Sequence, residues 1–370
     1  MQQIGVGIIG ASTTGWAAAS HVPALAALPG FALRAVSTSR PESARAAAAA
    51  HGVRGYDNHR DLVADPDVDL VVVAVKVTHH RELTAAALAA GKDVFTEWPL
   101  GVDLAQAEEL TRLATTRGVR TVTGLQGRFA PAARYARDLI ADGYVGEVLG
   151  TTLVGSAGAW GPTATRANSY WFDAANGATT FTIPALHALD TLAHVLGEPA
   201  AVSAELVRRR EVATVVDDGG TLAVTSPDHV SLGGVLASGA ALSVYYRGGN
   251  SRGDNLHWEI NGTEGDLVLT ADTGNLQVAE PVLAGGRGEE SGTRPLRVPD
   301  TYYADVPRDL TGPAHNVAQL YAQHARDRAE GTSLVPDFHH ALHRHHLVEA
   351  VHRAAATGVR QQVPARGVRA

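Results

Sequence analysis

The chain has 370 residues, of which 45% are hydrophobic and 19% charged, and its formal net charge is −7 at neutral pH. This length favours two domains, and the negative charge argues against a nucleic-acid partner. The absence of cysteine excludes disulfides, iron–sulfur clusters and thiolate zinc sites. No basic leader and no apolar run of roughly 20 residues is visible, so we expect a cytoplasmic protein with no membrane partner.

The first 126 residues alternate short apolar strands with helices. In chain order, the pattern predicts strands at 6–10, 31–37, 70–75, 93–96 and 121–124, and helices at 14–28, 42–51, 80–90 and 104–116. Such alternation is typical of βαβ units, in which helices cover both faces of a parallel sheet. The sequence therefore predicts an N-terminal α/β domain over residues 1–126.

The pattern changes after residue 128. A helix is predicted at 131–141, and strands follow at 148–154, 201–208, 221–225, 230–237, 241–247, 256–261 and 266–269. Residues 271–312 are rich in glycine, proline and charge and are predicted to form loops, and helices follow at 315–330 and 338–357. We therefore expect a second domain over residues 127–370 with a mostly antiparallel sheet.

A phosphate-binding turn is predicted between the first strand and the first helix. The segment Gly10-Ala11-Ser12-Thr13-Thr14-Gly15 has the spacing of G-x-G-x-x-G, with Ser12 in place of the second glycine. Gly10 permits the tight turn, and free N–H groups at the helix start bind a pyrophosphate. Because Ser12, Thr13 and Thr14 add hydroxyl donors, the turn predicts a dinucleotide cofactor.

The end of the second strand bears on the choice between NAD and NADP. Thr38, Ser39 and Arg40 stand where an NAD-binding protein has a carboxylate for the ribose 2′-hydroxyl. Hydroxyls and a guanidinium suit a 2′-phosphate, so we favour NADP(H), with NAD(H) as the alternative. Ser39 and Glu42 also match a capping box, and an N-cap role for Ser39 is compatible with this function.

Three residues near the end of the strand at 70–75 are expected to contact the cofactor. Val75, Lys76 and His79 lie at the carboxyl end of this strand, where ligands of such sheets bind. Lys76 is a candidate catalytic residue, because a lysine beside the nicotinamide can donate or accept a proton. The alternatives for Lys76 are a phosphate or ribose contact, or a solvated loop lysine.

These motifs resemble the Gfo/Idh/MocA family of nicotinamide-dependent oxidoreductases over about residues 5–358. The resemblance rests on Gly7-Ile8-Ile9-Gly10 with His21 and Pro23, on residues 89–94 leading into Glu97-Trp98-Pro99-Leu100, on residues 144–148 and on Pro336-Asp337-Phe338. Leu125-Gln126-Gly127-Arg128 and Trp160-Gly161 are similar to the branch that includes a fungal galactose-pathway repressor. The resemblance implies an N-terminal Rossmann domain, then an α/β domain with a large open, mostly antiparallel sheet, and a homo-oligomer, either dimer or tetramer.

The chain departs from this family at two catalytic positions. The family usually has lysine where this chain has Trp98, and aspartate where this chain has Ile183, four residues before His187. His187 remains, and the resemblance implies that it is the general acid or base and contacts substrate. The alternative is a structural histidine on an amphipathic helix.

The resemblance also implies ligand contacts around these motifs. Glu97 is expected at the nicotinamide ribose, and Gln126 is expected to contact the cofactor. Trp98 is expected to stack on the nicotinamide or on a sugar, because aromatic faces offer apolar contact with fixed geometry. The alternatives are a strand-end salt bridge for Glu97 and a core position for Trp98.

Substrate contacts are predicted at Arg128, Asn168, Tyr170 and Trp171, besides Trp98 and His187. Trp171 and Trp160 suit carbohydrate stacking, although both are alternatively core residues. The histidine-rich run at 339–346 has spacings found in metal sites, but no carboxylate completes a site there. We therefore predict a solvated helix face at 339–346 and no metal.

The sequence thus favours an NADP(H)-dependent oxidoreductase that acts on a small molecule: a sugar, a sugar derivative or another small cyclic alcohol or ketone. The missing lysine and aspartate keep a second hypothesis open, a catalytically silent dinucleotide-binding regulator. A third hypothesis is a reductase of C=N or C=C substrates, which needs less acid–base machinery.

Overall fold

A computed structural model describes residues 3–365, which form two compact units. The first unit contains residues 3–126 together with 304–342, and the second contains 127–303 together with 343–365. This division differs from the predicted domains, 1–126 and 127–370, because residues 304–342 pack with the first unit.

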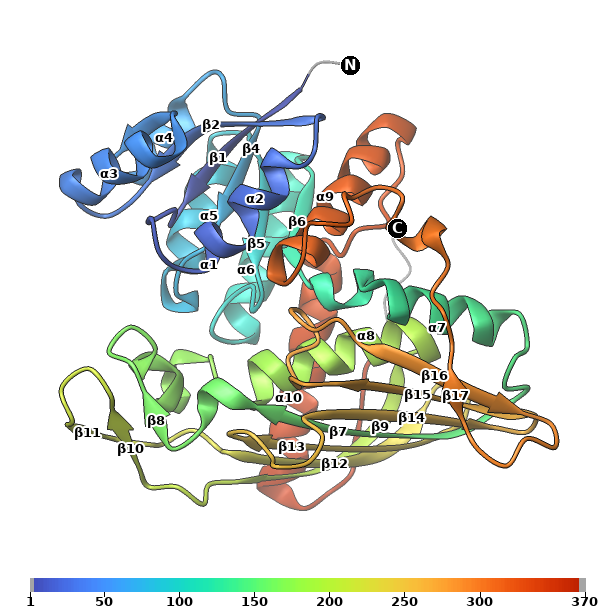
Figure 1. The fold of residues 1–370 in the computed structure, drawn as a ribbon. Coiled ribbons are helices and arrows are strands. Elements are labelled where there is room, and N and C mark those ends of the chain that lie inside the picture. Colours follow the sequence, from blue (N-terminus) through green and yellow to red (C-terminus); the bar gives the residue numbers. More distant parts are fainter. Residues whose placement is uncertain (1–2, 366–370) are drawn as a thin grey trace. The chain divides into compact units, whose positions relative to one another are not determined.

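The first unit is built on a parallel sheet of six strands in the order β3-β2-β1-β4-β5-β6 (Figure 1). The strands are β1 (Ile4–Ile9), β2 (Phe31–Ser37), β3 (Arg54–Tyr56), β4 (Leu70–Val73), β5 (Asp93–Glu97) and β6 (Thr121–Gly124). Val6, Ile8 and Val72 are fully buried, as expected when helices cover both faces. The arrangement confirms the predicted Rossmann fold, whose strand order reverses between β1 and β4.

Helices surround this sheet. They are α1 (Trp16–Ala19), α2 (His21–Ala26), α3 (Pro41–His51), α4 (His59–Ala64), α5 (His80–Ala89), α6 (Leu104–Arg117) and α9 (Pro313–Glu330). The helix α10 (Phe338–Thr357) begins in the first unit and ends in the second. Packing of α9 against α2 accounts for the place of residues 304–342 in this unit.

The single helix predicted at 14–28 is wrong, because the chain forms two short helices that meet at Ser20. Ser20 has φ −126° and ψ −65°, outside the helical region, and its hydroxyl donates to the carbonyl of Trp16. Pro23 has no N–H to donate to the carbonyl of Ala19, so a continuous helix would lack that hydrogen bond. The break therefore follows from the proline.

The sequence pattern also missed β3 and α4. The strand β3 has only three residues and is largely exposed, so it carries no apolar alternation. The helix α4 begins after Asn58, whose side chain accepts a hydrogen bond from the backbone N–H of Asp61. This is an ordinary N-cap, but the helix is too short to display a periodic pattern.

The second unit contains a nine-stranded sheet in the order β17-β16-β15-β14-β7-β13-β12-β9-β18. The strands are β7 (Val148–Ala157), β9 (Pro199–Val207), β12 (His229–Leu236), β13 (Ala241–Gly248), β14 (Leu256–Gly262), β15 (Gly265–Ala271), β16 (Val282–Arg287), β17 (Arg294–Pro295) and β18 (Gln361–Gln362). The pair β7–β13 is parallel, and the other neighbouring pairs are antiparallel. The sheet is therefore mixed and mostly antiparallel, as predicted.

One face of this sheet is covered and the other is open. In β13, Leu242 and Val244 are buried, whereas Ala241 and Ser243 are exposed. The helices α7 (Pro131–Ala141) and α8 (Leu186–Leu196) lie over one face (Figure 1). This alternation is typical of an antiparallel sheet with one solvated face and confirms the predicted open sheet.

The region at 271–312, predicted as loops, contributes β16 and β17 to the sheet, so that prediction is wrong in part. Residues 284–286 read Ala-Gly-Gly and show no apolar alternation. The glycines are used for close approach, because a Cβ on Gly285 would lie 2.8 Å from Leu296 and from the Tyr144 hydroxyl. This strand is stabilised by packing against residues distant in the sequence, which a local sequence pattern does not indicate.

A small three-stranded sheet stands beside the large one in the second unit. It contains β8 (Thr163–Ala164), β10 (Val212–Val215) and β11 (Thr221–Ala223), in the order β11-β10-β8. Its core consists of Ala164, Phe172, Ala213 and Val224. Trp171 and Leu222 pack against this core.

Candidate functional site

The turn after β1 brings the carboxyl ends of β1, β2 and β4 together. Gly10 has φ +99°, and a Cβ at this position would lie 2.4 Å from the carbonyl oxygen of Ala74. The backbone N–H of Gly10 donates to the carbonyl of Ser37 across 2.8 Å. Only glycine satisfies both the positive φ and the close approach, so the predicted role of Gly10 in a tight turn has a physical basis.

A cavity of about 710 Å³ opens at these strand ends. Its lining includes eight residues predicted to bind the cofactor, namely Gly10, Ser12, Thr38, Ser39, Arg40, Val75, Lys76 and His79. The volume lies within the range of small-molecule and cofactor sites. The carboxyl ends of parallel strands at a reversal of strand order are where dinucleotides bind, so the cavity fits the adenosine side of one.

The loop after β2 is held by its own hydroxyl groups. The Thr38 and Ser43 hydroxyl oxygens are 2.7 Å apart, and the Ser43 hydroxyl donates to the carbonyl of Arg40. The helix α3 begins at Pro41 with Arg40 as its N-cap, so the predicted capping role of Ser39 is wrong. Proline at the first helical position sets the helix start, and Arg40 and Ser39 both face the cavity.

The sequence did not predict the other residues that line this cavity. They are Ile9, Ser37, Ser43, Asp57, Asn58, His59, Ala74, Glu82 and Leu83. Asn58 and His59 lie beyond the short strand β3, which was not predicted. Ser43 lies in the first turn of α3, next to the loop that carries Thr38 and Arg40.

Lys76 lies in the same cavity as Arg40. It is exposed and precedes the short turn Val77–His79, with an extended backbone at φ −62° and ψ 136°. Next to it, the buried His80 ring places Nε2 3.0 Å from the carbonyl of Val75 and Nδ1 2.7 Å from that of Pro99. His80 thereby ties the end of β4 to the Glu97-Trp98-Pro99 segment.

The Glu97-Trp98-Pro99 segment is buried, and the peptide bond between Trp98 and Pro99 is cis. One carboxylate oxygen of Glu97, Oε1, is 2.8 Å from Nε2 of His21. Gly124, the residue opposite on β6, has no room for a side chain, since its Cβ would lie 2.7 Å from the Glu97 carboxyl carbon. Glu97 is therefore hydrogen-bonded to His21, and its carboxyl group fills the space where a side chain at position 124 would lie.

Gln126 is fully buried, and neither its amide nitrogen nor its amide oxygen has a hydrogen-bond partner among residues 3–365. A buried amide that lacks partners is costly, and a bound ligand is one source of such partners. The donor and the acceptor of this amide match a carboxamide, the group that nicotinamide carries. Gln126 thus fits its predicted contact with a cofactor, whereas the exposed Thr13 and Thr14 do not line the cavity.

His187 belongs to the second unit, in the first turn of α8, and its side chain is buried. A wider π-helical turn, Phe181–Ala185, precedes it and contains Ile183. The Thr182 hydroxyl donates to the carbonyl of Gly177 and accepts a hydrogen bond from the backbone N–H of Thr179. Wide turns of this kind occur frequently at functional sites.

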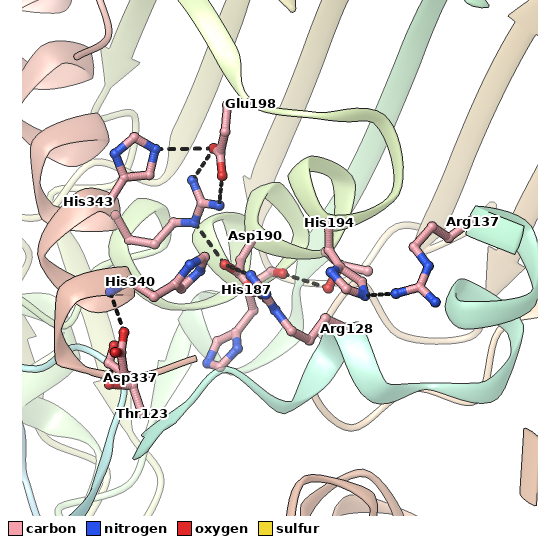
Figure 2. A network of polar contacts seen from close by, with 12 residues as sticks. Thr123, Arg128, Arg137, His187, Asp190, His194, Glu198, Asp337, His340 and His343 are labelled. Carbon is pink, nitrogen blue, oxygen red and sulfur yellow. Dashed lines mark hydrogen bonds and ion pairs between the residues drawn. The ribbon is translucent and has the colours of Figure 1, made fainter. Parts of the chain in front are cut away.

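Asp190, one turn beyond His187, is the centre of a buried charge network (Figure 2). Its carboxylate accepts hydrogen bonds from Arg128 Nε at 2.8 Å and Nη2 at 2.5 Å, and from Arg344 Nε at 2.7 Å. Arg344 also donates two hydrogen bonds to Glu198, and His343 lies 3.3 Å from the same carboxylate. Arg128, predicted as a substrate residue, is buried in this network.

The predicted aromatic substrate residues lie in the second unit. Trp160 and Trp171 stack on each other with centroids 4.4 Å apart and planes at 17°. The indole N–H of Trp160 donates to the carbonyl of Ala178, and Tyr170 and Asn168 lie on the adjoining 169–172 turn or at its cap. The stack leaves one face of each ring away from its partner, so a sugar contact at Trp171 stays a prediction.

The histidine-rich run on α10 is not the solvated face that was predicted. His340, His343 and His345 are buried, and burial lowers the pKa of His345 to about 3. The prediction of a solvated face was wrong because it assumed that polar residues face water. In the structure the buried His343 pairs with Glu198 instead. Among residues 3–365, no three His, Cys, Asp or Glu side chains are arranged to hold a metal ion.

Each unit matches the profile of a known protein family. The family profile of oxidoreductases of the Gfo/Idh/MocA type, described by its NAD-binding Rossmann fold, matches residues 4–125. The profile of the Gal80p C-terminal domain matches residues 131–271. A dehydrogenase of Aspergillus oryzae, aclE, is 36% identical over 68% of this chain and 71% of its own length. This chain belongs to the Gfo/Idh/MocA oxidoreductase family.

Two further relatives show the range of functions within this family. A crystal structure of a super-repressor mutant of Gal80p from Saccharomyces cerevisiae has a TM-score of 0.87 and 25% identity, with 98% of each chain covered. A levoglucosan dehydrogenase of Pseudarthrobacter phenanthrenivorans is 28% identical over 85% of this chain and 82% of its own length. Similar proteins thus include enzymes and a regulator. Within residues 3–365, no helix is both long and apolar enough to cross a membrane.

Proposed function

We propose that this family member is an oxidoreductase that prefers NADP(H) and transfers a hydride to or from a carbon of a sugar, a sugar derivative or another small cyclic alcohol or ketone. The observation that carries the cofactor preference is the cavity lined by Thr38, Ser39, Arg40 and Lys76. No carboxylate follows β2 at the place where NAD-binding proteins hold the 2′-hydroxyl. Two relatives that are dehydrogenases, one of them for levoglucosan, support the reaction class.

In this proposal the chain's own residues bind, orient and move a proton. The bound cofactor supplies or accepts the hydride. The imidazole of His187 takes the hydroxyl proton during oxidation and returns it during reduction. Asp190, one turn away on α8, is held by Arg128 and Arg344, so the helix that carries His187 has a fixed anchor. Asn168, Tyr170 and Trp171 are proposed to contact the substrate.

The test is the formation of reduced nicotinamide when the protein is mixed with NADP or NAD and a panel of sugars and polyols. We expect His187→Ala to abolish turnover while cofactor binding, measured by fluorescence titration, survives. A matched control is His257→Ala, on β14 in the same unit. Full activity of the His187 variant would show that this histidine is not the acid or base.

A catalytically silent dinucleotide-binding regulator is the second candidate. Trp98 stands where the family usually has a lysine, and a tryptophan cannot transfer that proton. The likeness to Gal80p favours the same alternative. Tight dinucleotide binding with no turnover across the panel would support it. Reduction of C=N or C=C compounds, added to the panel, would instead support the third candidate.

We also propose that the chain forms a dimer or a tetramer through the open face of the nine-stranded sheet. The exposed residues of that face include Ser203, Ser231, Gly233 and Ser243, which are small enough for another sheet to approach closely. Light scattering of the full chain measures this directly. A monomer at all concentrations would contradict the proposal.

A further inference from the structure

Two buried polar groups, the Tyr321 hydroxyl and the His21 ring, form a chain behind the carboxylate of Glu97, and all three residues belong to the first unit. The Tyr321 hydroxyl on α9 lies 2.8 Å from Nδ1 of His21, at the start of α2. Nε2 of the same ring lies 2.8 Å from Oε1 of Glu97, at the end of β5. Residues 21, 97 and 321 are far apart in the sequence, so this contact is built by the tertiary fold.

The directions of the two hydrogen bonds follow from the chemistry of the groups. A carboxylate only accepts, so the proton shared with Glu97 is on Nε2 of His21. In the neutral form of the ring, Nδ1 accepts and the Tyr321 hydroxyl is the hydrogen-bond donor. Burial, aided by the negative charge of Glu97, raises the pKa of Tyr321 well above its ordinary value, so this donor keeps its proton.

Aromatic packing fixes the position of the tyrosine. The Tyr321 ring lies 5.1 Å from that of Phe31 and 5.3 Å from that of Phe95, measured between centroids. The His21 ring packs edge-on against Phe95 at 5.0 Å. Tyr321 and His21 are both fully buried, so neither ring has room to leave its hydrogen-bonded position.

Only one oxygen of the Glu97 carboxylate is used by the protein within residues 3–365. Oε1 accepts from His21, and no hydrogen bond to Oε2 is formed by the described residues. Gly124 on β6 lies close to the same carboxyl group, because a Cβ at this position would be 2.7 Å from its carbon. A carboxylate that is held by one oxygen and presents the other is arranged to accept a hydrogen bond from a ligand.

The position of Glu97 indicates which part of the ligand it meets. The adenosine-side cavity is lined by the ends of β1, β2 and β4 and does not include Glu97. The strand β5 follows β4 in the sheet order, so its end is roughly 10 Å from the turn after β1, two interstrand spacings of about 4.8 Å. A dinucleotide that crosses the sheet edge from that cavity meets Glu97 with its second ribose.

We propose that Tyr321 and His21 are positioning residues that orient the Glu97 carboxylate to accept a hydrogen bond from a hydroxyl of the nicotinamide-side ribose. The inference rests on dinucleotide binding, which is part of the proposed function, but it does not require turnover. It therefore applies equally to an enzyme and to a silent dinucleotide-binding protein.

The test compares two ligands, NADP and its adenosine-side fragment 2′,5′-ADP, by calorimetry on the full chain. Tyr321→Phe keeps the ring and removes only the hydroxyl. We expect it to weaken NADP binding about fivefold to twentyfold, the effect of one hydrogen bond, and to leave 2′,5′-ADP binding unchanged. Tyr246→Phe, which removes another buried tyrosine hydroxyl in the second unit, is the matched control and should change neither.

A double-mutant cycle separates positioning from general damage. In a Glu97→Ala background, Tyr321→Phe should have no further effect on NADP, because no carboxylate remains to be positioned. Gly124→Ala, which displaces the Glu97 carboxyl group and leaves the tyrosine intact, should reproduce the selective loss if Tyr321→Phe fails to fold.

The possible outcomes are distinct. Equal weakening of both ligands, additive effects in the cycle, or unchanged NADP binding in Tyr321→Phe or Gly124→Ala would overturn the positioning role. Failure of the wild-type chain to bind either nicotinamide dinucleotide would overturn the proposed function, and this inference with it. A selective, non-additive loss for NADP would establish the positioning role.

Discussion

Arg344 donates a hydrogen bond from Nε to Oδ1 of Asp190 across 2.7 Å, and the side chain of each residue is only 1% exposed. Arg128 donates two more hydrogen bonds to the same carboxylate. Two guanidinium groups thus converge on one buried charge, and Glu198 balances the second of them. Breaking a buried pair of this kind leaves an uncompensated charge away from water, which costs more than the pair itself contributes.

We expect Asp190→Asn to lower the free energy of unfolding by about 3–5 kcal/mol, because Arg128 and Arg344 would stay buried after losing the charge of Asp190, and Arg344 would keep its pair with Glu198. Urea denaturation followed by circular dichroism measures the change. The control is Glu109→Gln, which breaks the exposed pair with Arg81 and should have no measurable effect. Equal stability of the Asp190 variant and wild type would mean that the network is not a stabilising anchor for α8.

His194 predicts a pH dependence of stability. Burial, reinforced by the positive charges of Arg128 and Arg137, lowers its pKa to about 3, and Arg137 donates a hydrogen bond to its Nε2 (Figure 2). The pKa in the unfolded chain is about 6.5, so at intermediate pH only the unfolded chain binds this proton. Stability is therefore full above pH 6.5 and falls with decreasing pH.

This one histidine should lower the free energy of unfolding by about 2 kcal/mol between pH 7.5 and pH 5. The variant His194→Gln should remove that share of the slope, as measured by denaturant titrations at several pH values. The exposed His339 serves as the control, since His339→Gln should leave the slope as it is. An unchanged slope in His194→Gln would show that its imidazole is protonated in the folded protein.

Arg40→Ala tests the cofactor preference. Loss of a guanidinium that binds a 2′-phosphate should weaken NADP by about 10–100-fold, the range for hydrogen bonds to charged groups, with little change for NAD. Titration of both dinucleotides gives the ratio of dissociation constants. The control is Arg45→Ala, at an exposed position of α3 that does not line the cavity. A parallel loss for both dinucleotides would place Arg40 on a phosphate that they share.

Lys76→Ala distinguishes a cofactor-binding role of this lysine from a catalytic one. Since Lys76 and Arg40 line one cavity, we expect the variant to raise the dissociation constant for NADP by about tenfold. A catalytic lysine would instead lose turnover while cofactor binding survives. Equilibrium titration and steady-state kinetics on the same sample separate these results.

The sequence predicted the first sheet well because its signals are local. The run Leu70-Val71-Val72-Val73 is apolar throughout, as a strand buried on both faces must be, and Gly10 marks the turn that follows β1. Eight predicted cofactor residues line one cavity for the same reason, since strand ends in a parallel sheet share an edge. Local spacing was sufficient there.

Features that depend on distant partners were not predictable. The buried histidines of α10 read as a polar surface, because Glu198, which pairs with His343, is about 145 residues away. The contact of His21 with Tyr321 spans 300 residues, and no spacing rule connects them. Asp190, which pairs with Arg128, is 62 residues away in the sequence, so local spacing does not indicate this buried pair.

Because residues 304–342 belong to the first unit, this unit cannot be expressed or exchanged as one continuous N-terminal segment. A polypeptide ending at residue 126 would contain every strand of the parallel sheet, yet it would lack α9, and Phe31, Phe95 and His21 would lose their contacts with Tyr321. Residues 3–126 alone therefore do not make up the complete first unit. If recombination between relatives exchanged only the N-terminal third, the new first unit would need an α9 with matching contacts. Residues 3–126 and α9 are therefore expected to change together in evolution.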